Sequence, residues 1–289
     1  MILVAGATGA VGGTIVRDLL AKGESVRALV RPATDPDGLA AAGADIVRGD
    51  LRDPATLVDA CEGVSVVIST ASATSRTDDT PENVDARGNA NLIDAARDAG
   101  VRHFVLISSV GASPDSPAPA FRAKAAAEAH LRASGLDYTI LQPTPHMDVW
   151  FGMLIEMPLS MGQPVTLVGE SRGRHSFIAQ RDVAAFTELS ADQPAARNAT
   201  LVIGGPAAIT FRDVVRAYEK ALGRPIPVRS VAPGEPIPGV PEPVWGIAAA
   251  LESFDTMIPM DDLARTFGVR LTSASELART SRLVAGPRG

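Results

Sequence analysis

Residues 2–12 read Ile-Leu-Val-Ala-Gly-Ala-Thr-Gly-Ala-Val-Gly, so four apolar residues run directly into a loop that holds three glycines. The apolar run has no polar alternation, which is typical of a parallel strand buried on both faces. A helical pattern follows at once, near residues 10–22. A strand, a glycine loop and a helix in this order predict the first βα unit of a doubly wound parallel sheet.

The glycine loop has the spacing Gly-x-x-Gly-x-x-Gly at Gly6, Gly9 and Gly12. Glycines here allow a tight turn and a close approach of the backbone to a pyrophosphate, whose charge meets the free amides of the helix N-terminus. The strand before the loop and the helix after it make the motif specific, and a plain strand-to-helix turn is the weaker interpretation. The residues predicted to contact a dinucleotide here are Gly6, Thr8, Gly9, Ala10, Val11 and Gly12.

The end of the second expected strand, residues 25–30, predicts which dinucleotide binds. An NAD site usually carries Asp or Glu at this place, whereas this chain has Arg31. A guanidinium attracts a 2′-phosphate, and a charge-assisted contact of about 1.5–3 kcal/mol corresponds to about a ten- to hundredfold preference. We therefore predict NADP(H) in preference to NAD(H), with a solvated surface arginine as the alternative interpretation of Arg31.

The third expected strand, residues 44–47, leads into Gly49, Asp50 and Leu51. A carboxylate in this loop is placed to accept a hydrogen bond from the adenine amino group, so Asp50 and Leu51 join the predicted cofactor site. We also expect Ala71, Ser72 and Pro143 at the cofactor.

The rest of the first half repeats the alternation of buried strands and helices. Residues 81–99 form its clearest helix, because Thr80 suits the N-cap, Pro81 the first turn and Gly100 the left-handed stop. Further strands are expected at 64–69, 103–107 and 138–141, and further helices at 54–61 and 119–134.

The second half has a different composition, since all six methionines other than Met1 lie beyond residue 146. We predict an α/β fold in which residues 1–146 form a Rossmann domain. Residues 147–289 form a smaller, partly interleaved α+β substrate-binding part, from which residues 177–203 return to the sheet. Strands are expected at 176–179 and 200–203, an irregular loop at 233–243, and helices near 181–191, 211–222, 244–253, 259–267 and 273–284.

Charge and composition narrow the class of protein. With 27 Lys and Arg against 33 Asp and Glu, the net charge is −6, which argues against a nucleic-acid partner. Cys61 is the only cysteine and excludes an internal disulfide, and the four histidines are scattered, so no zinc-ligand spacing exists. The N-terminus has no signal-peptide pattern and no apolar run is long enough to span a membrane. We therefore expect a cytoplasmic protein.

Several motifs together resemble the atypical short-chain dehydrogenase/reductases, in particular their NmrA-like branch. They are the glycine loop, Arg31 and the runs at residues 49–51, 83–92, 141–144 and 177–184. The resemblance is strong over residues 1–190. It implies NADP(H) binding and a substrate cleft between the carboxyl edge of the sheet and the second half. It also implies one of two functions: NADPH-dependent reduction of quinones or triphenylmethane dyes, or a redox-sensing regulatory role.

The same resemblance implies catalytic positions, and one of them is altered. Family members with full dehydrogenase chemistry use a Ser and Tyr-x-x-x-Lys. Lys124 matches the lysine and is predicted to hold the nicotinamide ribose, with Glu128 one turn on as a possible ion-pair partner. Ser109, or its neighbour Ser108, matches the serine. Ala120 stands where the tyrosine belongs, which argues against alcohol dehydrogenase and sugar epimerase chemistry.

The segment after the sixth expected strand is rich in methionine and aromatic residues: Met147, Trp150, Phe151, Met153, Leu154, Met157 and Met161. The family implies that it forms an adaptable apolar wall of the substrate pocket, whereas core packing is the favoured interpretation of most of these residues singly. His146 is expected where the cleft opens, as a catalytic or substrate-contacting group, and His175 is a weaker candidate; a structural role is the alternative for each.

The sequence therefore predicts an NADPH-dependent oxidoreductase, monomeric or homodimeric, that transfers hydride to a small hydrophobic acceptor such as a quinone. Its predicted catalytic residues are Lys124, Ser109 and His146. The alternative is a non-catalytic NADP(H) sensor that acts through a protein partner.

Overall fold

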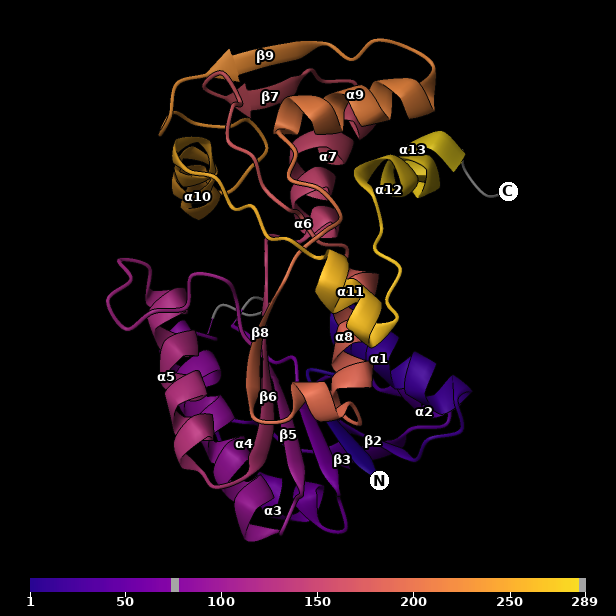
Figure 1. The fold of residues 1–289 in the computed structure, drawn as a ribbon, viewed down its shortest axis with the longest axis vertical. Helices are drawn as coiled ribbons and strands as arrows, with labels where there is room; N and C mark the ends of the chain where they lie inside the picture. The colour runs from indigo at the N-terminus through magenta and orange to yellow at the C-terminus, as the bar shows by residue number, and fades with distance from the viewer. Residues whose placement is uncertain (74–77, 286–289) are drawn as a thin grey trace. The chain divides into compact units, whose positions relative to one another are not determined.

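The computed structural model describes residues 1–73 and 78–285 (Figure 1). Its contacts divide the chain into two compact units. The first comprises Met1–Pro143 and Val183–Val202, and the second comprises Thr144–Asp182 and Ile203–Gly289. The first division therefore falls at Pro143, slightly before the expected boundary at residue 146.

The first unit is built on a seven-stranded, mostly parallel sheet with the strand order β3-β2-β1-β4-β5-β6-β8. The pairs β1–β2, β1–β4, β2–β3, β4–β5 and β5–β6 are all parallel. This order is that of a Rossmann sheet, which confirms the predicted doubly wound α/β fold. The strands are β1 (Ile2–Ala5), β2 (Val26–Val30), β3 (Asp45–Arg48), β4 (Val66–Ser69), β5 (His103–Ile107), β6 (Asp137–Pro143) and β8 (Ala199–Ile203).

Helices flank this sheet, and α4 packs against both α3 and α5 (Figure 1). The helices are α1 (Ala10–Ala21), α2 (Asp37–Ala41), α3 (Ala55–Cys61), the π-helix η1 (Pro81–Ala86), α4 (Arg87–Asp98), α5 (Pro119–Ala133), α8 (Gln180–Ser190) and the short η3 (Pro194–Ala196). The expected helix 81–99 is thus a π-helical turn followed by an α-helix.

The start and stop of that helix are as predicted. The hydroxyl of Thr80 accepts a hydrogen bond from the backbone amide of Asn83, and the side-chain oxygen of Asn83 accepts one from the backbone amide of Thr80. The two bonds form a capping box. Gly100 closes the helix with a φ of 72°.

One hydrophobic cluster of the first unit lies between the sheet and the helices α3, α4 and α5. Fully buried strand residues such as Leu3, Val67 and Phe104 meet Leu92 and Leu131 of the helices. The apolar runs read from the sequence therefore become the central strands, buried on both faces as parallel strands must be.

The second unit has its own parallel strand pair, β7 (Val165–Val168) with β9 (Val228–Val231), which the sequence analysis did not predict. Its helical elements are α6 (Met147–Phe151), the π-helix η2 (Gly152–Glu156), α7 (Met157–Ser160), α9 (Phe211–Leu222), α10 (Glu242–Ser253), α11 (Asp261–Phe267), α12 (Ala274–Thr280) and α13 (Arg282–Ala285). None of the helices described in either unit is long and apolar enough to cross a membrane.

The strand expected at residues 176–179 is wrong. This segment makes only isolated bridges, such as that between His146 and Ile178, although Phe177, Ile178 and Ala179 are fully buried. Its apolar run reflects burial in the core, and a short buried run does not by itself distinguish a strand from other extended backbone.

The methionine and aromatic residues of α6, η2 and α7 chiefly build the core of the second unit. Met147, Trp150, Phe151 and Leu154 are buried, and Met153 packs against them. Of its methionine and aromatic residues, Met157 and Met161 at the end of the segment are exposed. Core packing is therefore the role of most of this segment.

Candidate cofactor site

The glycine loop joins β1 to α1, and its backbone leaves no room for side chains at two of its glycines. Gly6 has a φ of +77°, and a Cβ there would lie 2.4 Å from Oγ1 of Thr70. A Cβ on Gly12 would lie 2.3 Å from the carbonyl oxygen of Gly6. Gly9 is the N-cap of α1, and no side chain caps the helix there. Its N-terminus is consequently open to an anion.

A pocket of about 370 Å³ opens beside this loop. It lies at the carboxyl ends of the strands around β1 and β4, where the strand order reverses and where doubly wound folds bind dinucleotides. Its lining brings together most of the predicted cofactor residues. The lining residues are Gly6, Thr8, Gly9, Leu29, Arg31, Thr34, Gly49, Asp50, Leu51, Thr70, Ala71, Ser72 and Val84.

The remaining predicted cofactor residues stand outside this lining. Ala10, Val11 and Gly12 form the first turn of α1. Pro143 ends β6, where its carbonyl accepts the amide of Val110. Lys124 lies on α5.

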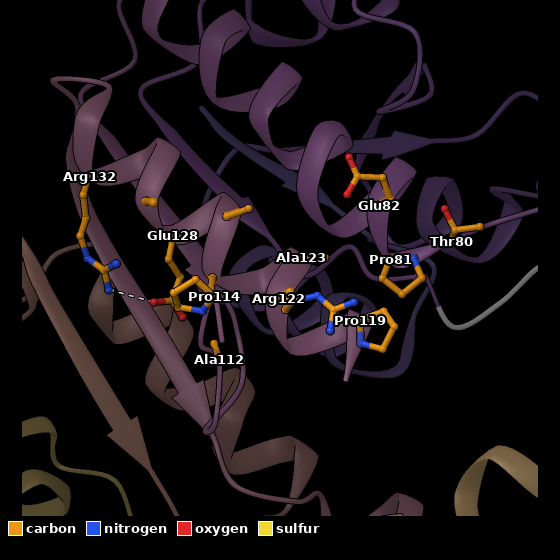
Figure 2. A pocket seen from close by; sticks show the side chains of 13 residues that line it. Thr80, Pro81, Glu82, Ala112, Pro114, Pro119, Arg122, Ala123, Glu128 and Arg132 are labelled. Atoms are coloured by element: carbon orange, nitrogen blue, oxygen red, sulfur yellow. Dashed lines mark hydrogen bonds and ion pairs between the residues drawn. The ribbon is translucent and has the colours of Figure 1, made fainter. Parts of the chain in front are cut away.

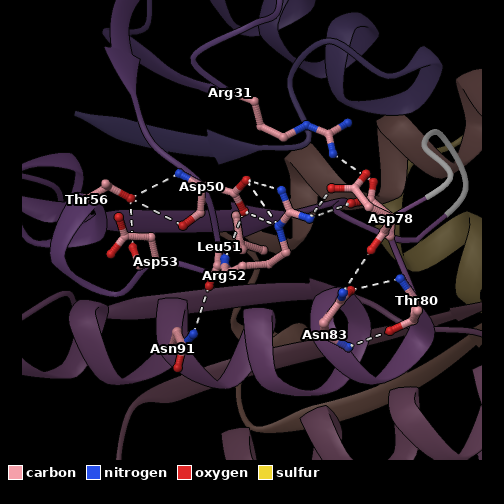
Figure 3. Close-up of polar contacts among 11 residues, drawn as sticks. Arg31, Asp50, Leu51, Arg52, Asp53, Thr56, Asp78, Thr80, Asn83 and Asn91 are labelled. Atoms are coloured by element: carbon pink, nitrogen blue, oxygen red, sulfur yellow. Dashed lines mark hydrogen bonds and ion pairs between the residues drawn. The ribbon is translucent and has the colours of Figure 1, made fainter.

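Arg31 and Arg52 form ion pairs with three aspartates at the rim of the pocket, and Figure 3 shows Arg52 between Asp50 and Asp78. Arg31 pairs with Asp79 at 2.7 Å. Arg52 reaches Asp50 at 2.7 Å and Asp78 at 2.8 Å. The Arg52 hydrogen bond holds the pKa of Asp50 below its ordinary value. The carboxylate predicted to contact adenine is therefore already paired with a cation.

Sequence reasoning missed Arg52, Asp78 and Asp79. Arg52 lies two residues after Asp50, so a local ion pair was a signal available in the sequence. The two aspartates precede Thr80, and only the fold brings them to Arg31 and Arg52.

Lys124 is part of a buried network with Asp85 of η1. Its Nζ lies 2.9 Å from Oδ1 of Asp85, which also accepts the hydroxyl of Ser72 at 2.7 Å. The other oxygen of Asp85 accepts the amide of Ala73 at 2.9 Å. Asp85, which the sequence analysis did not single out, thus joins Lys124 to a residue of the pocket lining.

The possible ion pair between Glu128 and Lys124 does not form, because each side chain has other partners. Glu128 accepts the hydroxyl of Ser108 at 2.5 Å and the amide of Gln142 at 2.8 Å, and it pairs with Arg132 at 2.9 Å. The two side chains leave α5 in different directions, because Glu128 is buried towards β5 and β6 whereas Lys124 meets η1.

The remaining predicted catalytic residues differ in their surroundings. Ser109 is half-buried and its hydroxyl donates to the carbonyl of Val110 at 3.1 Å. His146 is half-buried and belongs to the second unit, whereas Lys124 and Ser109 belong to the first. His175 is fully buried, with its Nε2 at 2.7 Å from the carbonyl of Leu251, and burial lowers its pKa. His175 therefore has the environment of a neutral structural histidine.

A larger and more open groove of about 720 Å³ runs along α5 (Figure 2). Alanines and prolines line much of it, and none of the predicted site residues does. Glu128 and Arg132 at one end pair with each other, and Arg122 donates to the carbonyls of Ser116 and Pro117. Within residues 1–73 and 78–285, no group of three His, Cys, Asp or Glu side chains is arranged to hold a metal ion.

Comparisons with known proteins agree with this geometry. Residues 6–194 match the family described as NAD(P)H-binding. The NAD(P)H azoreductase of Xenophilus azovorans is 34% identical over 231 residues, which cover 78% of this chain and 75% of that protein. The photosystem II assembly factor Ycf39 of Trieres chinensis is 30% identical over 233 residues, or 80% of this chain and 72% of that protein.

A solved structure shares nearly the whole fold. The Citrobacter sp. triphenylmethane reductase, crystallised with NADP(H), has a TM-score of 0.81 and 25% sequence identity. The match covers 96% of this chain and 99% of that one.

Proposed function

This chain belongs to the NAD(P)H-binding family, and from that premise we propose that it is an NADPH-dependent oxidoreductase that reduces a small hydrophobic acceptor. The observation that carries the proposal is the pocket beside the glycine loop, where the absence of side chains at Gly6 and Gly12 lets the loop turn tightly and Arg31 lies at the rim. The similarity to an NAD(P)H azoreductase and to a triphenylmethane reductase supports a reductase. We assign the chain to the NmrA-like atypical short-chain dehydrogenase/reductases on the motifs given above.

We propose that different residues bind different parts of the cofactor. The glycine loop and the N-terminus of α1 bind the pyrophosphate, because unfilled backbone amides and the helix dipole favour an anion there. Arg31 binds the 2′-phosphate, so that NADP(H) is preferred to NAD(H). Lys124 binds the nicotinamide ribose, and Asp85 orients it by the 2.9 Å ion pair. The other cofactor contacts proposed are Thr8, Ala10, Val11, Asp50, Leu51, Ala71, Ser72 and Pro143.

The residues of α5 limit the kind of acceptor that the site can reduce. When bound, NADPH supplies a hydride, which carries two electrons. Ala120 stands in the first turn of α5 in place of the family's tyrosine, and the two tyrosines of the chain lie on β6 and α9. No phenol of α5 is therefore available to move a proton in step with the hydride. Quinones and azo compounds take a hydride and then a proton from water, and a cationic triphenylmethane dye takes a hydride alone, so these acceptors fit this arrangement best.

Ser109 and His146 are the residues we propose to contact the acceptor. A serine hydroxyl can donate to an acceptor oxygen or nitrogen, and a histidine can donate or accept according to its protonation. The enzyme is proposed to act in the cytoplasm as a monomer or homodimer, with neither nucleic acid nor membrane as partner.

A second function is also tested, because an assembly factor is nearly as similar to this chain as the azoreductase is. The photosystem II assembly factor of Trieres chinensis is 30% identical, and Ala120 removes the residue most characteristic of the family's chemistry. The chain would then be an NADP(H) sensor that reports the redox state of the cofactor pool to a protein partner.

Steady-state assays distinguish the two functions. NADPH absorbance is followed with a panel of azo dyes, quinones and triphenylmethane dyes, and NADPH binding is measured in parallel by calorimetry. Turnover with one acceptor class, sensitive to Ser109→Ala, supports the reductase. Tight NADPH binding without turnover of any acceptor supports the sensor, and absence of NADPH binding contradicts both.

A further inference from the structure

Asp79 holds an unusual position for an acidic residue at a dinucleotide pocket. An acidic residue that selects NAD usually stands at the end of the second strand, where this chain has Arg31. Asp79 instead comes from the segment before η1 and reaches the same guanidinium, with Nη1 of Arg31 at 2.7 Å from Oδ2 of Asp79. The fold therefore brings both a cation and a carboxylate to the rim of the pocket.

The Asp79 carboxylate is buried whereas its partner remains accessible. The Asp79 side chain is 1% exposed and the Arg31 side chain is 28% exposed. The second carboxylate oxygen, Oδ1, accepts no hydrogen bond from any residue the structure describes, and Nη1 of Arg52 lies 3.5 Å from it. A buried oxygen with this unmet acceptor capacity is costly unless a further donor reaches it.

We propose that Asp79 is a specificity-determining residue that weakens the selection of NADPH over NADH. Its charge neutralises Arg31, so a 2′-phosphate, with its charge of about −1.5 to −2, must share the guanidinium with a carboxylate. NADH carries a neutral hydroxyl at this place, which can donate to a carboxylate. This inference rests on the NADPH-binding function proposed above and makes the preference for NADPH a modest one.

The opposite role for Asp79 predicts the opposite result. If the carboxylate served only to orient Arg31 towards the phosphate, its removal would weaken NADPH binding. The direction of the change in affinity therefore separates the two roles.

The test substitutes Asp79→Asn, which keeps the shape of the side chain and removes its charge. Dissociation constants for NADPH and for NADH are measured by calorimetry at one fixed ionic strength, since salt screens these charges. We expect NADPH to bind about tenfold more tightly and NADH to change by less than about twofold. Adding Arg31→Ala to the Asp79→Asn variant removes the gain.

Asp45→Asn is the matched control. It removes the same charge and breaks an ion pair of the same length, that of Asp45 with Arg27 at 2.7 Å, at the more exposed amino end of β3. Its dissociation constants for both cofactors are expected to stay within about twofold of wild type. Asp79→Ala is carried in parallel, with thermal unfolding of each variant, so that one misfolded variant does not decide the outcome.

Unchanged or weaker NADPH binding by the folded Asp79 variants overturns the role of Asp79. A gain of the same size in Asp45→Asn also overturns it, because the effect would then come from net charge alone. If the wild-type chain binds neither cofactor, the proposed function itself fails, which is a different result.

Discussion

The two units of this protein bury polar groups in different ways. Near the pocket of the first unit, the buried carboxylates Asp79 and Asp85 pair with Arg31 and Lys124, whose side chains are 28% and 16% exposed. In the second unit, the buried side chains of Asp182 and Tyr218 are satisfied by partners of the same unit. Asp182 accepts the amide and the hydroxyl of Thr272, and Tyr218 donates to Glu156 at 2.6 Å.

This difference separates ligand binding from architecture. A cation that keeps part of its surface exposed can exchange a protein carboxylate for a charged ligand. A pair that is buried on both sides, such as Asp182 with Thr272, cannot reach a ligand and contributes only to the stability of the fold. Substitutions at the residues around the pocket of the first unit should therefore act on cofactor affinity, and substitutions at Asp182 or Tyr218 in the second unit should act on stability.

The largest effect is expected at Gly12. In Gly12→Ala the new Cβ would lie 2.3 Å from the carbonyl of Gly6, so the loop must shift away from its pyrophosphate-binding shape. We expect NADPH affinity to fall by roughly a hundredfold or more, measured by calorimetry. Gly38→Ala is the matched control, since a Cβ there meets open space. Wild-type affinity in Gly12→Ala would contradict the role of the loop.

A smaller loss of affinity is expected at Lys124. Lys124→Ala removes one charge-assisted contact with the ribose, and we expect NADPH to bind about tenfold more weakly. It also leaves Asp85 buried without its cation, which destabilises the fold.

The double variant Lys124→Ala with Asp85→Asn separates these two effects. It should recover much of the stability in urea unfolding without recovering NADPH affinity. Lys22→Ala, which breaks the ion pair with Glu188 instead, is the control. If the double variant binds NADPH like wild type, Lys124 has a structural role only.

In the second unit, Tyr218→Phe should change stability and leave cofactor affinity alone. The variant loses the 2.6 Å hydrogen bond from the Tyr218 hydroxyl to the half-buried Glu156. We expect the free energy of unfolding to fall by about 1 kcal/mol in urea titrations. A tenfold change in NADPH affinity would break the proposed division between the units.

The smallest effect is expected at Glu276, in the capping box that starts α12. The Ser273 amide, with Arg270, lowers the pKa of Glu276 to about 2 from an ordinary value of 4.5. A lowered pKa means that the ionised carboxylate stabilises the folded state above about pH 4.5, and this contribution is lost as the pH falls towards about 2. In Glu276→Gln, the free energy of unfolding should therefore fall less steeply than in wild type as the pH drops below about 4.5. An equally steep fall would contradict this assignment.

Much of the fold could be predicted because its signals are local. The glycine loop, the Thr80 cap and the Gly100 stop depend on backbone angles and on residues within one turn, and all three were predicted. The strand β9 was missed because most of it is exposed and it lacks a buried apolar run, and its partner β7 lies outside the regular alternation of strands and helices. The buried run at residues 176–179 was misassigned because its apolar residues reflect burial, which is a property of the fold and not of a strand alone.

The candidate site divides in the same manner. The sequence by itself determined the Rossmann topology, the glycine loop, the cation at Arg31 and the place of Lys124 on its helix, because each follows from local spacing of residues. Only the tertiary structure decided the partners: Asp85 for Lys124, Ser108 for Glu128 and Asp79 for Arg31. Side chains far apart in the chain meet where a parallel sheet brings its strand ends and loops to one edge. The charge balance at that edge, and with it the proposed choice of cofactor, is therefore a property of the folded chain.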